Sequence, residues 1–460
     1  MSFSLQDLVG ARAPENLDLY ARTVNPQLVR VLRSIGFDRT YVRGEGAYLF
    51  DREGRRYLDF LSGFGVFGLG RAHPALKAAL HEAIDADLPG LVQLDAPLLP
   101  GLLAEALIAR CGPQMGRVFF TNSGAEAVEA ALKFARSATG RPRVLYADHA
   151  FHGLTYGALS ANGGSDFKTG FGPLLPGFDQ VRFGDIDALD RALRPGDVAA
   201  LLLEPIQGKG VNLAPIEYWD AVAALCRKHG TLLICDEVQT GLGRTGTFWA
   251  HEHDGVVPDI ITTSKALSGG FVPVGAMICS TAIGDRVYSS MERAMVHSST
   301  FKGNPLAMVA GLATLATIDD EHLVDRARQS GDALEKAMAP LVEKYDFFHA
   351  TRGRGLMIGL VFGSPSSRGA RVRFRLLEAA HEGLFSQLIV APLFTRHGVI
   401  TQVAGDRMNV VKLLPPLICG QAEIDHFIEA LDDVLDDARR SSLLVDFAKT
   451  LAKASLHRSH

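Results

Sequence analysis

A lysine and an aspartate follow two short strand-like runs near the middle of this 460-residue chain. The apolar run 231–235 precedes Asp236, and a second short run, residues 259–264, precedes Lys265. Runs of this length are consistent with buried parallel strands, whose carboxyl ends meet at one edge of a sheet. At that edge a lysine can form a Schiff base while a carboxylate pairs with a protonated ring nitrogen, as pyridoxal phosphate enzymes require. Because most lysines are solvated surface charges, this interpretation of Lys265 depends on further motifs.

Small residues stand where another strand-like run turns into a helix. Residues 118–121 are mostly apolar, and residues 122–127 lead into a helix predicted over 125–138. Backbone N–H groups and the Ser123 hydroxyl at such a helix start can bind a phosphate, whose charge the helix dipole favours. A capping box, with Ser123 as the cap and Glu126 three residues later, is the alternative explanation of the same pattern.

Strand-like runs alternate with helical periodicity through the middle of the chain, which predicts an α/β fold with a large, mostly parallel sheet. The predicted strands are 118–121, 143–147, 199–204, 232–236, 260–263 and 275–279. Helices are predicted between them, including 125–138 and 215–228. Ligands of such sheets bind outside the carboxyl ends of the strands, which is where Glu204, Asp236 and Lys265 are expected.

The two ends of the chain differ from this middle part. Residues 40–60 alternate as a hairpin does, and strand and helix patterns return after residue 345. We therefore expect a smaller α+β domain built from both chain ends. The expected divisions are an N-terminal segment of the small domain at 1–70, a large cofactor-binding domain at 71–345, and a C-terminal small domain at 346–460. Apolar residues at helical spacing predict a terminal helix within the last part: Leu443, Leu444, Phe447, Leu451 and Ala454.

The overall composition excludes several classes of partner. The 47 basic and 51 acidic side chains give a formal net charge of −4, and the chain has no dense basic block. We therefore expect no nucleic acid and no membrane as partner. No apolar run has the length of a membrane span, and the N-terminus lacks the features of a signal peptide. The five scattered cysteines predict reduced thiols in a cytoplasmic protein, with no disulfide or metal framework: Cys111, Cys226, Cys235, Cys279 and Cys419.

One motif suggests a different cofactor. Residues 63–68 match the glycine pattern of dinucleotide-binding loops, and Asp85 lies about twenty residues further on. Asp85 falls at the end of a helix predicted over 74–86 and does not follow a second strand, so a nicotinamide or flavin site is disfavoured. We expect this loop to line a pocket, with Phe64 and Phe67 as apolar walls.

Six segments resemble, in order and spacing, those of the class III aminotransferases: residues 122–127, 151–153, 204–208, 236–246, 264–267 and 300–305. The resemblance extends over nearly the whole chain and is nearest to the putrescine and ornithine branch. It implies a fold-type-I enzyme, a homodimer with shared active sites, and pyridoxal phosphate as the cofactor. Lys265 and Asp236 would be the catalytic residues. Lys265 would hold the cofactor and move a proton, and Asp236 would keep the ring nitrogen protonated.

The same resemblance implies cofactor contacts for further residues. Three would hold the phosphate, joined by a threonine from the second subunit: Ser123, Gly124, Ala125 and Thr300. Four would surround the ring: Phe151 and Val238 on its two faces, Gln239 at the phenolic oxygen, and Glu204 as support behind the aspartate. Without this motif context, Phe151 and Val238 would be interpreted as ordinary core residues.

The chain departs from ornithine-type members of the family where those members bind the substrate carboxylate. They carry an arginine in a late segment and a gating glutamate just after residues 204–208, whereas here the two places hold Lys412 and Lys209. A lysine lacks the planar fork with which arginine binds both oxygens of a carboxylate. The two lysines either point apart into solvent or hold a distal anion of the substrate between them.

These observations predict an aminotransferase that acts on a primary amine, a diamine or an ω-amino compound, or on the matching aldehyde or ketone. A keto acid or an amino acid would be the second substrate. An ornithine or acetylornithine aminotransferase, or an aminomutase or decarboxylase of the same fold, is the alternative. A cofactor-binding regulator without turnover is disfavoured, because Lys265 and Asp236 are intact and the chain has no separate DNA-binding segment.

Overall fold

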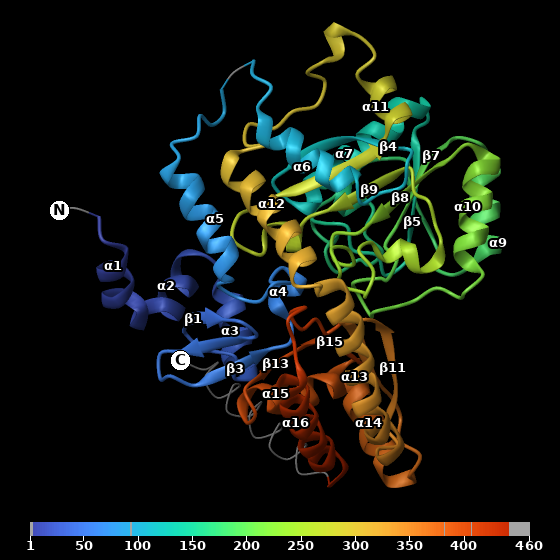
Figure 1. Ribbon diagram of the computed structural model, residues 1–460. Helices are drawn as coiled ribbons and strands as arrows, with labels where there is room; N and C mark the ends of the chain where they lie inside the picture. Colours follow the sequence, from blue (N-terminus) through green and yellow to red (C-terminus); the bar gives the residue numbers. More distant parts are fainter. Residues whose placement is uncertain (1–2, 93, 381, 406, 441–460) are drawn as a thin grey trace.

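The computed structural model of the chain describes residues 3–440 apart from 93, 381 and 406. In this part of the chain, seven strands form a central sheet in the order β4-β10-β9-β8-β7-β5-β6 (Figure 1). Their bounds are β4 Met115–Thr121, β5 Arg143–Ala147, β6 Phe178–Val181, β7 Val198–Leu203, β8 Leu232–Asp236, β9 Ile260–Thr263 and β10 Gly275–Ser280. The strands from β9 to β6 are parallel, whereas β10 is antiparallel to both β4 and β9. The predicted large, mostly parallel sheet is confirmed.

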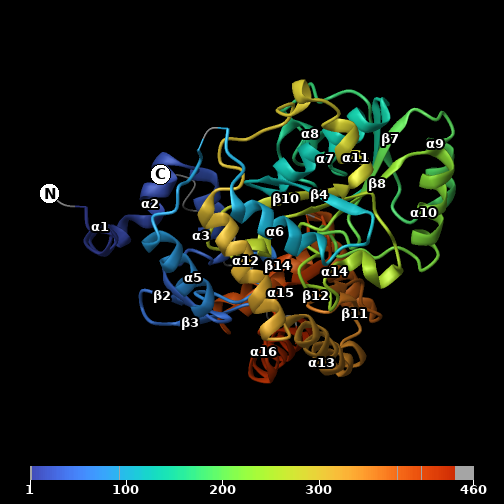
Figure 2. The same ribbon diagram turned by 45° about the horizontal axis from the view of Figure 1, so that its top comes forward.

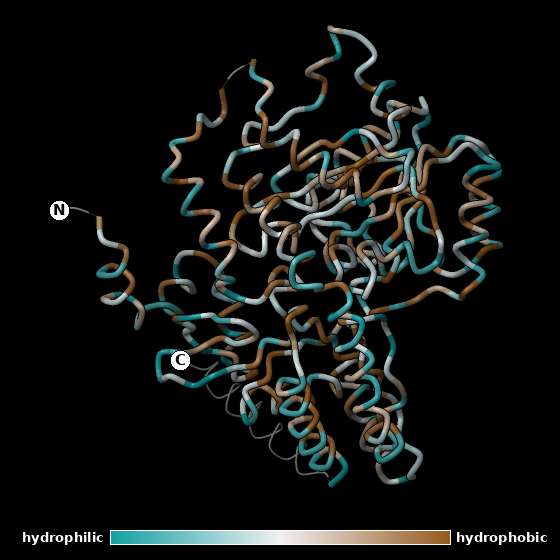
Figure 3. The backbone as a smooth tube through the Cα atoms, viewed as in Figure 1, coloured by the Kyte–Doolittle hydropathy of each residue, from teal (hydrophilic) through white to brown (hydrophobic). Residues whose placement is uncertain are grey.

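Helices cover both faces of this sheet. α7 Gly124–Thr139 packs on one face through residues spaced three or four apart, such as Val128 and Ala131. α9 Ile186–Leu193 and α10 Tyr218–His229 pack on the other face. Residues 200–203 of β7 alternate between the two apolar clusters, as a strand covered on both faces requires. Hydrophobic residues therefore run along the central strands between the helix layers (Figure 3).

Three further helices pack against one another beside the sheet: α5 Pro74–Asp85, α6 Leu98–Ile108 and α12 Pro305–Asp320. Shorter helices in the same part of the chain are α4 Ser62–Gly65, α8 Tyr156–Ser160, η2 Ala250–Asp254, η3 Lys265–Ser268, α11 Thr281–Val287 and η4 Met291–Arg293. Residues 63–68 lie between the strand β3 Arg56–Asp59 and α5, and β3 pairs antiparallel with the preceding strand, β2 Tyr48–Asp51. A dinucleotide-binding loop needs a parallel βαβ unit, so this segment lacks the required context.

A smaller domain combines the two ends of the chain, as predicted. β1 Tyr41–Glu45, β2 Tyr48–Asp51 and β3 Arg56–Asp59 form antiparallel pairs, and β13 Val399–Ile400 adds to β3 as a parallel strand. A second sheet has the order β11-β12-β15-β14, with bounds β11 Phe348–Arg354, β12 Met357–Phe362, β14 Gln402–Val403 and β15 Val410–Leu413. The accompanying helices are α13 Leu323–Lys344, α14 Arg368–Ala380, α15 Leu384–Thr395 and α16 Gln421–Arg440. The domain boundaries at residues 70 and 345 stay a prediction.

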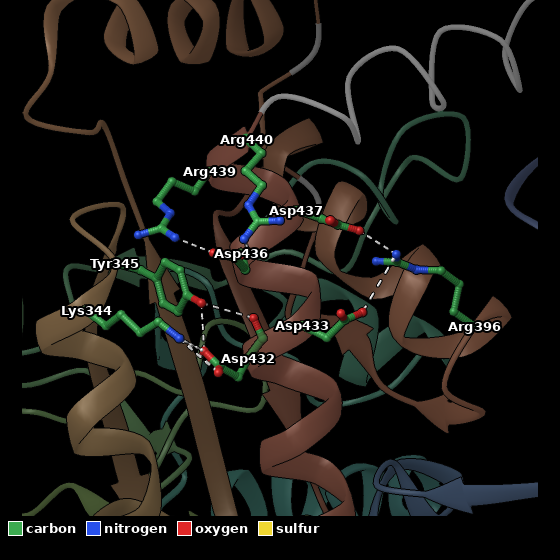
Figure 4. A network of polar contacts seen from close by, with 9 residues as sticks. All are labelled: Lys344, Tyr345, Arg396, Asp432, Asp433, Asp436, Asp437, Arg439 and Arg440. Carbon is green, nitrogen blue, oxygen red and sulfur yellow. Dashed lines mark hydrogen bonds and ion pairs between the residues drawn. The ribbon is translucent and has the colours of Figure 1, made fainter.

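Polar contacts connect α16 to its neighbours in the small domain (Figure 4). Lys344 Nζ and the Tyr345 hydroxyl each donate to Asp432 Oδ1 at 2.7 Å, and Arg396 forms an ion pair with Asp437. Several of these side chains are substantially exposed, so solvent screening makes the contribution of each pair to stability small. The buried apolar face of α16 therefore accounts for most of its attachment.

The N-terminal helices are α1 Leu5–Arg12, α2 Asn16–Thr23 and α3 Pro26–Ile35. α1 projects from the molecule in both views (Figure 1, Figure 2). The predicted terminal helix lies outside the described residues, as do the residues that predicted it: Leu443, Leu444, Phe447, Leu451 and Ala454. Within the described ranges, no helix is long and apolar enough to cross a bilayer.

Candidate active site

The carboxyl ends of three adjacent strands bring together the charged residues that were predicted from the sequence. β7 ends just before Glu204, β8 ends at Asp236, and β9 ends two residues before Lys265. Lys265 has a φ of 36°, a value that residues with a side chain adopt only where the surrounding structure enforces it. This local strain marks Lys265 as a candidate functional residue.

The carboxylate of Asp236 is buried and held by three donors. The Thr262 hydroxyl and the Val238 N–H donate to one oxygen at 2.9 and 3.1 Å, and His152 Nδ1 lies 2.7 Å from the other oxygen. These contacts fix the orientation of the carboxylate. The sequence did not predict a role for His152, because nothing in its spacing indicates that its ring reaches β8.

Burial and neighbouring charges act on the lysine and on a second carboxylate. Burial lowers the pKa of Lys265, and the charges of Asp236 and Glu204 oppose this effect. Burial raises the pKa of Glu204. The Glu204 carboxylate accepts hydrogen bonds from the Gly208 N–H at 2.8 Å and the Phe151 N–H at 3.1 Å. Glu204 therefore fixes the backbone at Phe151 as well as adding negative charge near Lys265.

The start of α7 forms a tight turn of small residues. The Ser123 hydroxyl accepts a hydrogen bond from the Glu126 N–H at 3.2 Å and so caps the helix, whereas Glu126 Oε2 accepts from the N–H of Asn122, the residue before the cap, at 2.6 Å; the capping box is therefore present in a modified form. The N–H groups of the first helical residues have no partner within the helix and can serve an anion. A Cβ on Gly124 would come within 2.8 Å of Val238 Cγ1, so only glycine permits this approach.

Aromatic residues lie around the same edge. Phe151 is half-buried, and Phe64 is 45% exposed in the distorted helix α4, where it has a φ of 63°. Phe67 stacks against Arg71, whose guanidinium carbon lies 3.9 Å from the ring centroid. The prediction that Phe64 and Phe67 form the walls of a substrate pocket stays a prediction.

Gln239 and Lys412 connect the sheet edge to Phe64. Lys412 is only 6% exposed, and its Nζ donates to the Gly208 carbonyl at 2.9 Å and to Gln239 Oε1 at 3.4 Å. Gln239 Nε2 donates to the Phe64 carbonyl at 3.1 Å, and Lys412 Nζ lies 5.8 Å from the Phe64 ring centroid. Burial, with the nearby charge of Lys265, lowers the pKa of Lys412 to about 7. Lys412 therefore does not point into solvent. The interpretation in which both lysines point apart into solvent does not hold for Lys412.

Lys209 has a partner within its own chain. Its Nζ donates to Asp166 Oδ2 at 2.6 Å and lies 4.7 Å from the Phe167 ring centroid. Lys209 and Lys412 thus contact different groups. An anion held between the two lysines stays a prediction.

Thr300 lies on the segment between η4 and α12 and is exposed. Its neighbour Ser299 accepts a hydrogen bond from Asn122 Nδ2 at 2.9 Å. The Thr300 segment therefore contacts the loop that leads into α7, next to Ser123.

Comparison with known proteins places this geometry in a family. A family model for class III aminotransferases matches residues 34–435. An acetylornithine aminotransferase from Mycolicibacterium smegmatis is 41% identical over 407 residues, covering 87% of this chain and 94% of that protein. Aminotransferase PigE from Serratia sp. is 36% identical over 455 residues; the match covers 92% of this chain but only 53% of PigE. The crystal structure of an S-selective transaminase from Arthrobacter sp. has a TM-score of 0.79 at 27% identity, covering 92% of this chain and all of that one.

Aminotransferases of this class use pyridoxal phosphate, and the residues at the sheet edge fit that group. Asp236 offers a buried carboxylate of fixed orientation, and the α7 start, which Gly124 brings close to Val238, presents helix N–H groups that can serve a phosphate. Lys265 offers an amine whose pKa burial lowers. The predicted fold-type-I architecture and the predicted cofactor are confirmed. The chain belongs to the class III aminotransferases.

Proposed function

We propose that this enzyme exchanges an amino group between a primary amine, a diamine or an ω-amino compound and a keto acid, with Lys265 as the residue that binds the cofactor. The observation that carries this proposal is the meeting of Lys265, Asp236 and Glu204 at one sheet edge. Pyridoxal phosphate, when bound, withdraws electrons from the carbon that carries the amino group. The protein must supply a movable proton, a fixed counter-charge and a dry pocket.

Lys265 is suited to proton transfer because burial lowers its pKa. A lowered pKa leaves more of the amine unprotonated near neutral pH, and only the unprotonated amine can accept a proton or act as a nucleophile. Thr262, Val238 and His152 hold the two oxygens of Asp236, so its carboxylate would keep one orientation toward the ring nitrogen of a bound cofactor. The proposed roles are proton transfer at Lys265 Nζ and a fixed negative charge at Asp236.

The remaining cofactor contacts are proposed from the same geometry. The α7 start would hold the phosphate, and the ring would lie between two side chains: Ser123, Gly124 and Ala125 for the phosphate, Phe151 and Val238 for the ring. Glu204 supports Phe151 through its backbone N–H. Gln239 keeps its side chain between Lys412 and the Phe64 backbone, within the same network.

The substrate side lacks a bidentate carboxylate clamp. Lys412 carries three N–H donors, and two of them already point at the Gly208 carbonyl and Gln239. Lys209 is engaged by Asp166. Lys412 would offer a substrate α-carboxylate one remaining N–H donor and no planar fork, which favours amine substrates without that group.

Similarity to the acetylornithine aminotransferase from M. smegmatis supports a second candidate, an amino acid donor of the ornithine type. A panel of amine donors against pyruvate and 2-oxoglutarate distinguishes the two. We expect simple amines and diamines to have higher kcat/KM than ornithine and acetylornithine. Lys412→Arg should raise kcat/KM for α-amino acid donors by about tenfold, because a bidentate ion pair is stronger by about 1.4 kcal/mol or more. A wild-type preference for acetylornithine over every simple amine would establish the second candidate instead.

We also propose that the enzyme is a homodimer with shared active sites. Exposed apolar side chains gather on two projecting segments, one between α5 and α6 and one between α11 and α12 (Figure 1). They include Leu91, Leu94, Met291, Met295 and Phe301, and Leu98 at the start of α6 is exposed as well. Leu94 is 97% exposed and Met291 is 90% exposed, which is costly in a monomer and typical of an interface. Thr300 lies on the second of these segments.

Mixing two inactive variants tests the shared site. Lys265→Ala and Thr300→Ala homodimers should both be impaired, whereas hybrid dimers contain one site with an intact Lys265 and an intact partner threonine. Activity should therefore reappear after the two variants are unfolded and refolded together. Sedimentation that reveals a fully active monomer would refute the shared site.

A further inference from the structure

Residues 162–169, here called the cover segment, pack against residues 150–153. Asn162 Oδ1 accepts a hydrogen bond from the His152 N–H at 2.7 Å, and Asn162 Nδ2 donates to the Gly153 carbonyl at 2.8 Å. The Gly163 N–H donates to the Ala150 carbonyl at 2.8 Å. The cover segment thus fixes the backbone on both sides of Phe151 and His152.

The ring of Phe151 has a neighbour in the same segment. Phe167 meets it at a centroid distance of 5.4 Å and an interplanar angle of 64°, an edge-to-face contact. The backbone N–H of Phe151 is held separately by Glu204. The position of the Phe151 ring therefore depends on Phe167 as well as on its own backbone.

Lys209 connects the cover segment to the loop after β7. Its ammonium donates to Asp166 Oδ2 at 2.6 Å and faces the Phe167 ring at 4.7 Å, so one cation contacts two adjacent residues of the segment. The side chain of Lys209 is 14% exposed and that of Asp166 is 35% exposed. The hydrogen bond from Lys209 lowers the pKa of Asp166, and Arg407 adds to this effect. Asp166 is thus charged at neutral pH, and its contact with Lys209 is partly shielded from water.

We propose that Lys209 and Asp166 are positioning residues that hold Phe167 against Phe151 and so control how firmly the cofactor ring is retained. This inference rests on the proposed role of Phe151 at the ring. It gives Lys209 a function that requires no anion from the substrate. The ion pair connects two loops that meet at Phe151, the cover segment and the loop after β7.

An ordinary surface ion pair of similar length would contribute little, because water and salt screen it. Two features separate this pair from such a contact. Lys209 is largely buried, and it contacts the aromatic ring that covers Phe151. Because Arg407 also acts on Asp166, replacing Asp166 removes the interaction more completely than replacing Lys209.

The test compares cofactor retention in the full-length holoenzyme and in its variants. Asp166→Asn, Lys209→Met and Phe167→Leu each remove one member of the contact. Lys228→Met, at an exposed pair with Asp190 at 3.5 Å, is the matched control. The readouts are the rate of cofactor loss during dialysis and the visible circular dichroism of the bound cofactor, which reports the asymmetry of its surroundings.

We expect each of the three variants to lose cofactor about three- to tenfold faster than wild type and to change the visible dichroism, whereas the control should match wild type. The effects of Asp166→Asn and Lys209→Met should not add in the double variant, since both remove one interaction. Lys209→Arg keeps the cation and should lie closer to wild type than Lys209→Met.

Wild-type retention and an unchanged dichroism in both Asp166→Asn and Phe167→Leu would overturn the inference. Additive effects in the double variant would overturn it as well. Phe167→Leu leaves both charges in place, so it tests the aromatic contact even if a charge variant folds poorly. A wild-type protein that binds no cofactor would instead refute the proposed function, so the two failures are distinguishable.

Discussion

Replacing Lys412 by methionine tests the electrostatics of the site, because the two side chains have similar length and differ in charge. Lys412 is 6% exposed and contacts a carbonyl and an amide oxygen, with no carboxylate among its hydrogen-bond partners. Burial, with the charge of Lys265, lowers its pKa from 10.5 to about 7. While Lys412 is charged, it therefore destabilises the folded state relative to the unfolded chain.

The direction of this pKa shift determines the pH dependence. Between pH 7 and 10.5 the unfolded chain retains the proton that folded Lys412 releases, so the wild-type free energy of unfolding rises with pH. Each pH unit in this window is worth about 1.4 kcal/mol, which gives about 5 kcal/mol over the full difference. Below pH 7 folded Lys412 is charged, and the full cost of burying that charge lowers the free energy of unfolding. Relative to wild type, the free energy of unfolding of Lys412→Met should thus be highest at about pH 6. This difference should fall by about 4 kcal/mol by about pH 10.

Urea unfolding from pH 6 to 10, followed by tryptophan fluorescence, measures this difference. Both tryptophans, Trp219 and Trp249, are buried, so unfolding changes their surroundings. Refolding by dilution establishes reversibility at each pH. Lys228→Met replaces an exposed lysine and should keep a constant difference from wild type.

The slope of the stability difference with pH decides the outcome. The hydrogen bonds that Lys412→Met removes are worth about 1 kcal/mol each, and they shift the whole curve without creating this slope. A constant difference between wild type and Lys412→Met from pH 6 to 10 would mean that Lys412 has the same pKa folded and unfolded. That result would refute the argument that Lys412 is a buried amine of lowered pKa.

Lys265→Ala should abolish turnover and the yellow colour of the purified enzyme while its circular dichroism in the far ultraviolet stays native; unchanged turnover would sink the proposed mechanism. Asp236→Asn should lower kcat by about a thousandfold or more with cofactor still bound, because a neutral amide no longer favours a protonated ring nitrogen, and near-normal kcat would contradict its role. Gly124→Ala should weaken cofactor affinity severalfold without unfolding the protein, since its Cβ would meet Val238 Cγ1 at 2.8 Å; equilibrium dialysis measures this, and wild-type affinity would disprove the tight approach.

The sequence predicted the strands that position the site, since central parallel strands consist of unbroken apolar runs. β7 is such a run throughout and β8 up to Asp236, whereas β9 ends in two threonines; every residue of β7 and β9 is buried. β6 Phe178–Val181 escaped prediction because it is an edge strand whose two middle residues, Asp179 and Gln180, are polar and exposed. The charged residues at the strand ends could be predicted to lie together because the carboxyl ends of adjacent parallel strands meet at one edge of the sheet.

Residues that reach the site from loops could not be placed in the same way. His152 contacts Asp236 across 84 positions of sequence, and Asp166 contacts Lys209 across 43. No sequence pattern relates residues so far apart, so these pairs can be identified only in the folded chain. Their contribution is to orient residues that the strands already bring to the site.

The two lysines illustrate why the environment of a residue decides its chemistry. From the sequence, Lys209 and Lys412 were a pair of like charges near one pocket, and either solvent or a substrate anion had to separate them. In the structure, Lys209 has a carboxylate at 2.6 Å, whereas Lys412 has only neutral oxygens and little water. Lys209 thereby contacts the cover segment through Asp166 and Phe167. Lys412 is a buried amine whose charge changes near pH 7. If this separation is correct, replacing Lys412 should alter substrate preference and its pH dependence, whereas replacing Lys209 should alter cofactor retention and leave the order of preferred amines unchanged.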